Sequence, residues 1–131
     1  MLYEYQLSTP KETLYNITSQ VREAIAKSGV TSGAALVFCP HTTAGITINE
    51  NADPDVVHDI IHGLAKVFPD RPEFRHGEGN SAAHLKASCV GPSVSVIVEG
   101  GRPLLGTWQG IYFCEFDAPR NRRFYVKISR D

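Results

Sequence analysis

The chain has 131 residues, of which 42% are hydrophobic and 21% are charged. This length suits one domain, and this composition is too apolar for a disordered chain. Thirteen basic residues stand against 14 acidic ones, for a formal net charge of −1, so no overall positive field draws the protein to nucleic acid or to an anionic membrane. We expect a single compact domain over residues 1–131 that binds neither of these partners.

The three cysteines, Cys39, Cys89 and Cys114, are widely spaced and include no Cys-x-x-Cys pair. Such a pattern predicts neither a disulfide framework nor a cysteine zinc site. We interpret all three as reduced residues in apolar surroundings. The N-terminus lacks the basic start and long apolar run of a secretory signal, so we expect the protein in the cytoplasm.

The first part of the chain predicts strands around one helix. Apolar and polar residues alternate over 2–7, as in a strand. Apolar residues then recur every four positions from Ile17 to Ile25 and predict a helix that Gly29 ends. The apolar segments 34–39 and 45–48 predict two further strands, which we expect to be neighbours in a sheet.

The middle of the chain predicts two helices joined by a long loop. Asp53 can cap a helix that starts at Pro54 and runs to about Phe68. Residues 69–80 are rich in Pro, Gly and charged residues and predict a loop, and loops of this length are often functional. A short helix is predicted over 81–90.

The last part of the chain predicts four strands in succession, over 94–98, 104–107, 111–116 and 124–129. Strands therefore outnumber helices and arrive in consecutive runs. This order favours an α+β fold, in which two main helices and one short helix pack on a mainly antiparallel β-sheet.

His58 and His62 lie four residues apart on the predicted helix, a spacing at which two histidines can share a metal. On a helical wheel, however, they lie opposite the apolar arc. The zinc-protease motif also needs a glutamate where Asp59 stands. We therefore interpret both histidines as solvated surface residues.

His41, His76 and His84 lie instead in segments rich in small and polar residues. If the long loop folds back over the short helix, His76 and His84 can converge, and His41 would join them from the sheet. Three neutral imidazoles with an open fourth position suit a catalytic zinc. Acid–base groups are an alternative interpretation, and ordinary loop and cap histidines are a third.

Asn49, Glu50 and Asp53 lie where a predicted strand ends and a helix begins, which is a natural position for binding an anion or another ligand. Asp53 is equally explained as a cap. Glu50, if it lies beside His41, could act as a base, a metal ligand or an orienting group.

Trp108 and Gln109 form part of a compact Gly-Thr-Trp-Gln-Gly segment. The indole ring could form one side of a site for a planar substrate that Gln109 hydrogen-bonds. Alternatively, the segment could be a hairpin turn whose tryptophan is buried in the core. Glu115 interrupts an apolar strand, and a buried carboxylate needs a partner. The candidate partners are Arg120, Arg122 and Lys86.

Three segments together resemble the YjbQ-like, or secondary thiamine-phosphate synthase, family. They are His41–Pro54 (HTTAGITINENADP), His76–Lys86 with Glu78, Asn80 and His84 inside it, and Leu105–Ile111 (LGTWQGI). The likeness covers nearly the whole chain. It implies an α+β fold, a homotrimer, and a site built from His41, Asn49, Glu50, Asp53, His76, His84, Trp108 and Gln109.

The resemblance makes our leading hypothesis a thiamine-phosphate-synthase-like transferase, which couples a pyrimidine diphosphate to a thiazole phosphate. We assign catalysis to His41, Glu50 and Asp53, and substrate binding to Asn49, Lys86, Trp108, Gln109 and Arg120. We assign a divalent metal, zinc or magnesium, to His41, His76 and His84. The alternatives are a metal-dependent hydrolase or lyase that uses the three histidines, and a non-catalytic metabolite-binding protein.

Overall fold

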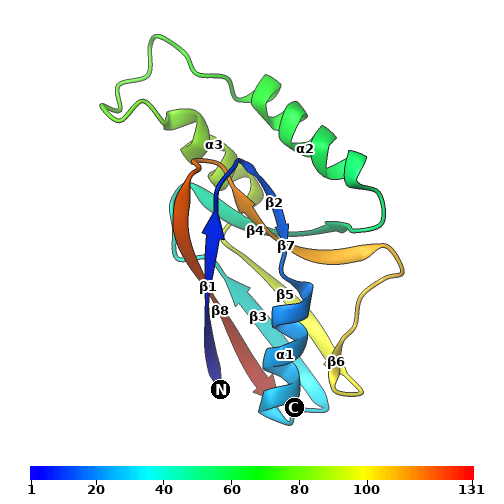
Figure 1. Cartoon of the computed structure of the whole chain (residues 1–131). Helices are drawn as coiled ribbons and strands as arrows, with labels where there is room; N and C mark the ends of the chain where they lie inside the picture. The colour runs from blue at the N-terminus through cyan, green and yellow to red at the C-terminus, as the bar shows by residue number, and fades with distance from the viewer.

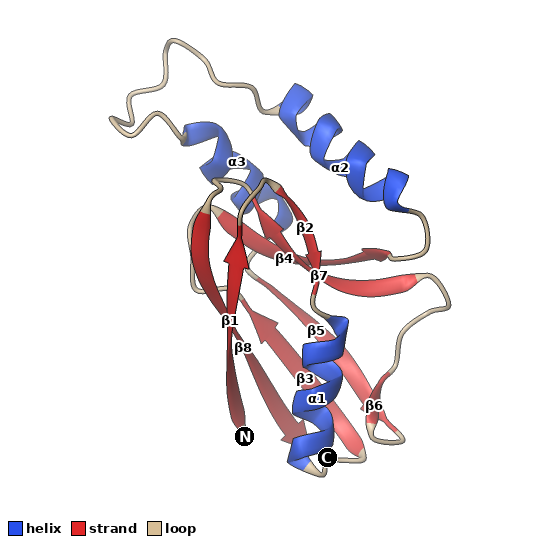
Figure 2. Ribbon diagram, in the orientation of Figure 1, coloured by secondary structure: helices blue, strands red, loops and turns tan.

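Eight strands form two antiparallel sheets, and three helices pack on them (Figures 1 and 2). The computed structural model describes all residues, 1–131. The α+β class expected from the sequence is confirmed. The elements are β1 (Leu2–Thr9), β2 (Thr13–Asn16), α1 (Thr18–Ser28), β3 (Ser32–Phe38), β4 (Ala44–Glu50), α2 (Pro54–Val67), α3 (Ser81–Val90), β5 (Ser93–Glu99), β6 (Arg102–Pro103), β7 (Gln109–Glu115) and β8 (Arg120–Arg130).

The larger sheet has the strand order β1-β8-β3-β5-β6, and α1 covers one of its faces (Figure 2). Val21 and Ile25 of α1 are fully buried against Val37 and Phe124 of the sheet. The helix ends at Gly29, whose φ of 71° is the left-handed conformation typical of a glycine after a helix. The predicted spacing of the first helix and its end are therefore confirmed.

The smaller sheet has the order β2-β7-β4, and its central strand β7 is buried on both faces. Phe113 points into the core shared with the larger sheet. Tyr112 and Cys114 point the other way, into a second cluster with Ala83 and Ala87 of α3. The smaller sheet therefore lies between the main core and the layer formed by α2 and α3.

A buried ion pair connects the two sheets. Arg122 of β8 donates to both carboxylate oxygens of Glu115 of β7, at 2.7 and 2.6 Å. Thr9 of β1 also donates to Glu115, at 2.6 Å, and Arg122 donates to the hydroxyl of Thr43 at 2.8 Å. Burial alone would raise the pKa of Glu115, but the hydrogen bonds from Arg122, Thr9 and the Asp117 backbone N–H hold it below its usual value. Arg122 is therefore the partner that Glu115 was expected to need.

Two strand predictions were wrong. The segments containing β3 and β4 are not neighbours, because β3 pairs with β5 and β8 whereas β4 pairs with β7 in the other sheet. The segment 104–107 is not a strand, since β6 consists only of Arg102 and Pro103 and is followed by a single further bond to β5, from the Leu104 N–H to the Ile97 carbonyl at 2.7 Å. Strand β2 was not predicted, because its four residues include only one buried apolar side chain, Leu14, and so give no clear alternation.

The expected cap of α2, the long loop and the short helix are confirmed, whereas the interpretation of the cysteines is wrong for one of them. Asp53 caps α2 by accepting from the Asp55 N–H at 2.9 Å, and the long loop and α3 lie where predicted. Cys39 and Cys114 are buried free thiols, whereas Cys89 is exposed, which corrects the interpretation of all three as apolar-site residues. None of the three helices is both long enough and apolar enough to cross a membrane.

We predict that Glu115→Gln lowers the free energy of unfolding by about 3–5 kcal/mol, because it leaves the buried Arg122 guanidinium without a counter-charge. Urea denaturation at neutral pH measures the loss. The matched control is Glu23→Gln, which breaks the exposed Glu23–Lys27 pair on α1 and should leave the urea midpoint unchanged. Similar midpoints for the two variants would show that the buried pair is not a major source of stability.

Candidate functional site

His76 and His84 meet where the long loop folds back onto α3. Their ring centroids lie 5.3 Å apart, with the rings edge to face at 82°. The convergence of these two histidines expected from the sequence is therefore confirmed. His84 lies one helical turn after Asn80, so the two residues share a face of α3.

Asn80 and Arg120 both bond the same carboxylate oxygen of Asp117. The Asn80 amide and the Arg120 guanidinium each donate to Asp117 Oδ2 at 2.8 Å. Burial would raise the pKa of Asp117, but hydrogen bonds from Arg120 and Asn80 hold it below its usual value. Because a carboxylate only accepts, the Asn80 amide nitrogen must face Asp117, and its carbonyl oxygen, which is buried, has no donor.

We call this set the histidine–arginine cluster. Its members come from the end of the loop, the start of α3, the turn after β7 and the first residue of β8; they are His76, Glu78, Asn80, His84, Asp117 and Arg120. Glu78 is included because its negative charge helps to raise the pKa of Arg120, after the larger effects of the Asp117 hydrogen bond and charge. The Arg120 side chain is 47% exposed, so guanidinium donors not used by Asp117 can reach a ligand.

His41 lies outside this cluster. Its Nε2 lies 3.0 Å from the Arg123 backbone nitrogen and 3.1 Å from the Arg123 carbonyl oxygen, so the ring accepts from the N–H or donates to the carbonyl according to its tautomer. The ring also lines a polar hollow of about 260 Å³, together with Arg122 and Glu4. Burial is the main cause that lowers the pKa of His41, and the positive charge of Arg122 lowers it further. A neutral His41 therefore holds the loop before β4 against β8.

The three histidines assigned to a metal do not come together in one chain. No group of three or more His, Cys, Asp or Glu residues in the chain is arranged to hold a metal ion. His76 and His84 form a pair, and His41 is used by the Arg123 backbone. One chain thus does not fit the three-histidine zinc or magnesium site, and we derive no chemical step from it.

Four other expected residues meet at the far end of β4, in what we call the tryptophan corner. Asn49, Glu50, Trp108 and Gln109, together with Ile48, line a cavity of about 310 Å³. The Trp108 side chain is not a core plug, because the residue is 63% exposed. Gln109 holds its turn by accepting from the Gly106 N–H at 2.8 Å, which leaves its amide NH₂ free to donate.

The length of β4 separates the tryptophan corner from the histidine–arginine cluster. In the β4–β7 pairing, Ala44 lies opposite Glu115 and Glu50 lies opposite Gln109. The seven residues of β4 span about 20 Å at roughly 3.3 Å per residue. The expected placement of Glu50 beside His41 is therefore wrong. Strand β4 separates the two residues, which lie toward opposite ends of the smaller sheet.

Lys86 is placed on α3 but faces away from solvent. Its side chain is 8% exposed, and its ammonium donates to Glu12 at 2.9 Å. A phosphate could reach this ammonium only by displacing Glu12. Of the two cationic side chains assigned to phosphate, Arg120 is therefore the accessible one.

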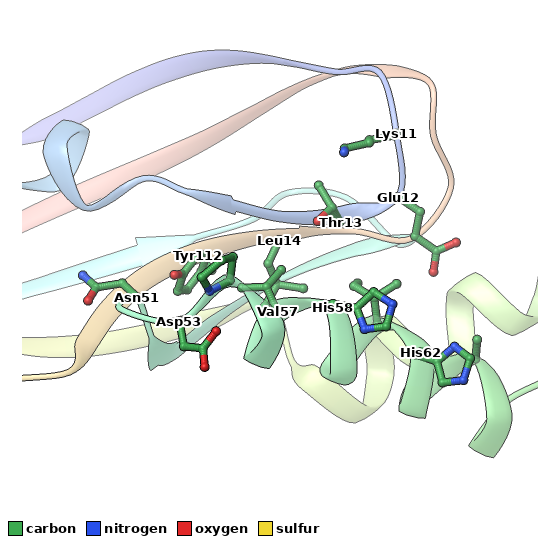
Figure 3. A pocket seen from close by; sticks show the side chains of 13 residues that line it. Lys11, Glu12, Thr13, Leu14, Asn51, Asp53, Val57, His58, His62 and Tyr112 are labelled. Carbon is green, nitrogen blue, oxygen red and sulfur yellow. The ribbon is translucent and has the colours of Figure 1, made fainter.

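Asp53, the remaining expected residue, lines a groove between α2 and β2 (Figure 3). The groove has a volume of about 660 Å³, within the range of ligand pockets. Its floor is apolar and includes Leu14, Val57 and Tyr112, while His58 and His62 lie along its α2 side. The two histidines are exposed as expected, but the groove beside them was not foreseen.

The sequence analysis missed Asn80 and Asp117 as site residues. Asn80 was named only as a member of the segment His76–Lys86. It lies at the N-terminus of α3, where its side chain makes no capping bond and instead donates to Asp117. Asp117 drew no attention because it lies in a turn between two apolar strands. A polar residue placed next to a predicted buried carboxylate, as Asp117 is to Glu115, is the signal that could have identified it.

Comparisons with known proteins agree on one family. The family model described as UPF0047 protein YjbQ-like matches residues 3–131. UPF0047 protein MJ1081 of Methanocaldococcus jannaschii is 57% identical over 132 residues, which cover all of this chain and 96% of that protein. UPF0047 protein YugU of Bacillus subtilis is 57% identical over 130 residues, 98% of each chain.

Solved structures have the same fold. A YjbQ/UPF0047 family protein from Clostridium acetobutylicum superposes with a TM-score of 0.94 at 57% identity, over 97% of this chain and 99% of that one. A protein of unknown function from Sulfolobus solfataricus, described as YbjQ-like, also gives 0.94, at 31% identity over 100% of this chain and 97% of that one.

We predict that acid destabilises the protein partly through His41. Its pKa in the folded state is below the ordinary value of 6.5, so the stability that neutral His41 contributes is complete above that value and is lost as the pH falls through the folded pKa. His41→Asn should therefore show a smaller loss of unfolding free energy than wild type between about pH 7.5 and about pH 5.5.

Urea denaturation at several pH values in this window measures the difference. Glu115 does not affect stability in this pH window. Its pKa in the folded state lies below the ordinary value of 4.5, so its contribution to the free energy of unfolding is lost only as the pH falls below that value. His58→Asn, at a side chain that is 74% exposed, is the control and should follow wild type. If the wild-type and His41→Asn curves run parallel, His41 is not the titrating group.

Proposed function

This chain belongs to the UPF0047 YjbQ-like family, and we propose that it is a small-molecule transferase with thiamine-phosphate-synthase-like activity, whose site is completed between copies of a homotrimer. The observation that carries the proposal is that two sets of ligand-competent side chains, the histidine–arginine cluster and the tryptophan corner, lie at opposite ends of β4. Each set alone offers only half of what this reaction needs.

The reaction joins two rings and releases pyrophosphate. The ring nitrogen of the thiazole phosphate attacks the methylene carbon of the pyrimidine diphosphate; a C–N bond forms, and the C–O bond to the diphosphate breaks with both electrons leaving on oxygen. No proton is lost from the attacking nitrogen, so catalysis consists of holding the rings in line and stabilising the leaving charge.

The histidine–arginine cluster suits the leaving group. Arg120 offers free guanidinium donors, which bind phosphate oxygens well. His76 and His84 can donate a hydrogen bond or a proton to the departing pyrophosphate, which is the role of a histidine in general acid catalysis. Asn80 acts through Asp117, because both Asn80 and Arg120 bond Asp117 Oδ2 and the carboxylate thereby holds the guanidinium in place.

The tryptophan corner suits the planar ring. The indole of Trp108 is exposed and can stack on an aromatic ligand. The amide oxygens of Asn49 and Gln109 accept backbone N–H bonds, so their NH₂ groups are left to donate to ring nitrogens. Glu50 places a carboxylate in the same cavity, where it can accept from an exocyclic amine.

Association of copies would bring the two sets together. In a cyclic trimer each contact joins different patches of neighbouring copies, so the cluster of one copy can face the corner of the next. The chain exposes large apolar side chains, which often mark interfaces between proteins; they include Leu36, Phe38, Ile97, Leu104 and Trp108. We place the reaction in the cytoplasm, whose reducing conditions suit three free thiols.

We predict that purified protein forms thiamine phosphate and pyrophosphate from the two substrates, and that His84→Ala and Trp108→Ala each abolish this activity. Neither side chain belongs to the main core, so both variants should fold, which circular dichroism checks. Wild-type protein that yields no product would overturn the proposed reaction.

Mixing the two inactive variants tests whether the site is shared. If they are unfolded and refolded together, random assortment in a cyclic trimer gives about a quarter of the sites one intact cluster facing one intact corner, and a similar fraction of activity should return. If each site lay within one chain, every site would carry one lesion and no activity would return. Sedimentation analysis of the same mixture confirms the trimer.

A further inference from the structure

His58 and His62 form a second histidine pair, apart from both proposed halves of the active site. They lie one turn apart on α2, with ring centroids at 5.8 Å and ring planes only 10° from parallel. Both residues are exposed, and neither belongs to a hydrophobic cluster of the fold. Two imidazoles held side by side at this spacing on a helix can share one metal ion.

A carboxylate fixes the orientation of one of these rings. The Nδ1 atom of His58 lies 3.0 Å from Oδ1 of Asp59. A neutral imidazole that donates its Nδ1–H to Asp59 keeps the lone pair on Nε2, which is the form that binds a metal. A carboxylate in this role is the usual outer partner of a metal-binding histidine.

The histidine pair lines the groove between α2 and β2. Glu12 projects into the groove from the turn before β2, on the wall opposite the two histidines (Figure 3). One oxygen of Glu12 bonds Lys86, and the other has no hydrogen bond to a protein donor. The groove thus places a carboxylate across from two imidazoles, although the three are not arranged as a closed site.

We propose that His58 and His62 bind one divalent transition-metal ion at the groove between α2 and β2, with Asp59 orienting His58. Imidazole ligands favour zinc, copper and nickel over magnesium and calcium. Because the chain supplies only two fixed ligands, water fills the remaining positions, and these face the groove. Such an ion is open to exchange and to a ligand bound in the groove, unlike a closed structural zinc.

Calorimetric titration of zinc or nickel chloride into untagged, chelator-treated full-length protein tests the site. Wild type should bind an ion that the double variant His58→Ala/His62→Ala does not bind. Asp59→Asn should weaken the affinity by about tenfold to a hundredfold, as loss of an outer partner does. All three side chains are exposed, so circular dichroism should show unchanged folding.

His84→Ala is the matched control, because it removes the other histidine pair and should leave the α2 ion in place. Nickel added below stoichiometry should also broaden the NMR signals of residues in α2 before those of α3. Equal binding by wild type and the double variant, or loss of the ion in His84→Ala alone, would overturn the proposal.

Discussion

Glu115 and Arg122 meet between the two sheets, and the arrangement of the rest of the molecule depends on their contact. The pair is almost completely buried, so neither charge can be solvated by water, and each must be satisfied by protein groups. Thr9, Thr43 and the Asp117 backbone supply those groups. The network thereby fixes four separate chain segments relative to one another with directional bonds, which apolar packing alone cannot do.

The same network positions the candidate chemistry. Asp117 follows Glu115 by two residues, and its side chain collects Asn80 from α3 and Arg120 from the start of β8. His41 is held two residues before Thr43 by the backbone of β8. The histidine–arginine cluster is thus an extension of the ion pair toward solvent. Asp117 and Arg120 lie at strand ends, Asn80 and His84 lie at the start of α3, and His76 and Glu78 lie in the long loop.

The central strand β7 explains why the site residues divide into two sets. It pairs with β4 along its whole length and is buried on both faces, so the two strands are a stiff spacer of about 20 Å. Within one chain, the side chains of the histidine–arginine cluster therefore cannot reach those of the tryptophan corner. In the proposed trimer, completion of the site across the interface would remove this restriction, because a neighbouring copy would present its own opposite end.

Local sequence signals determined the helices, their ends and most strands. Asp53 before Pro54, Gly29 after a four-residue apolar repeat, and the alternation in β1 act through neighbouring backbone atoms, so they can be read without the fold. Three separate motifs also identified the family. The solvent exposure of His58 and His62 followed from the helical wheel alone, because a wheel depends only on helix geometry.

Only the tertiary structure decided which of these residues meet. The assignment of β3 and β4 to different sheets, the use of Lys86 by Glu12, the pairing of Asn80 with Asp117, and the distance of Glu50 from His41 all depend on contacts between distant segments. Such contacts are chosen by the packing of the whole core and by the need to satisfy buried charges. A short segment contains neither kind of information, so its sequence shows which side chains are available and not which partners they acquire.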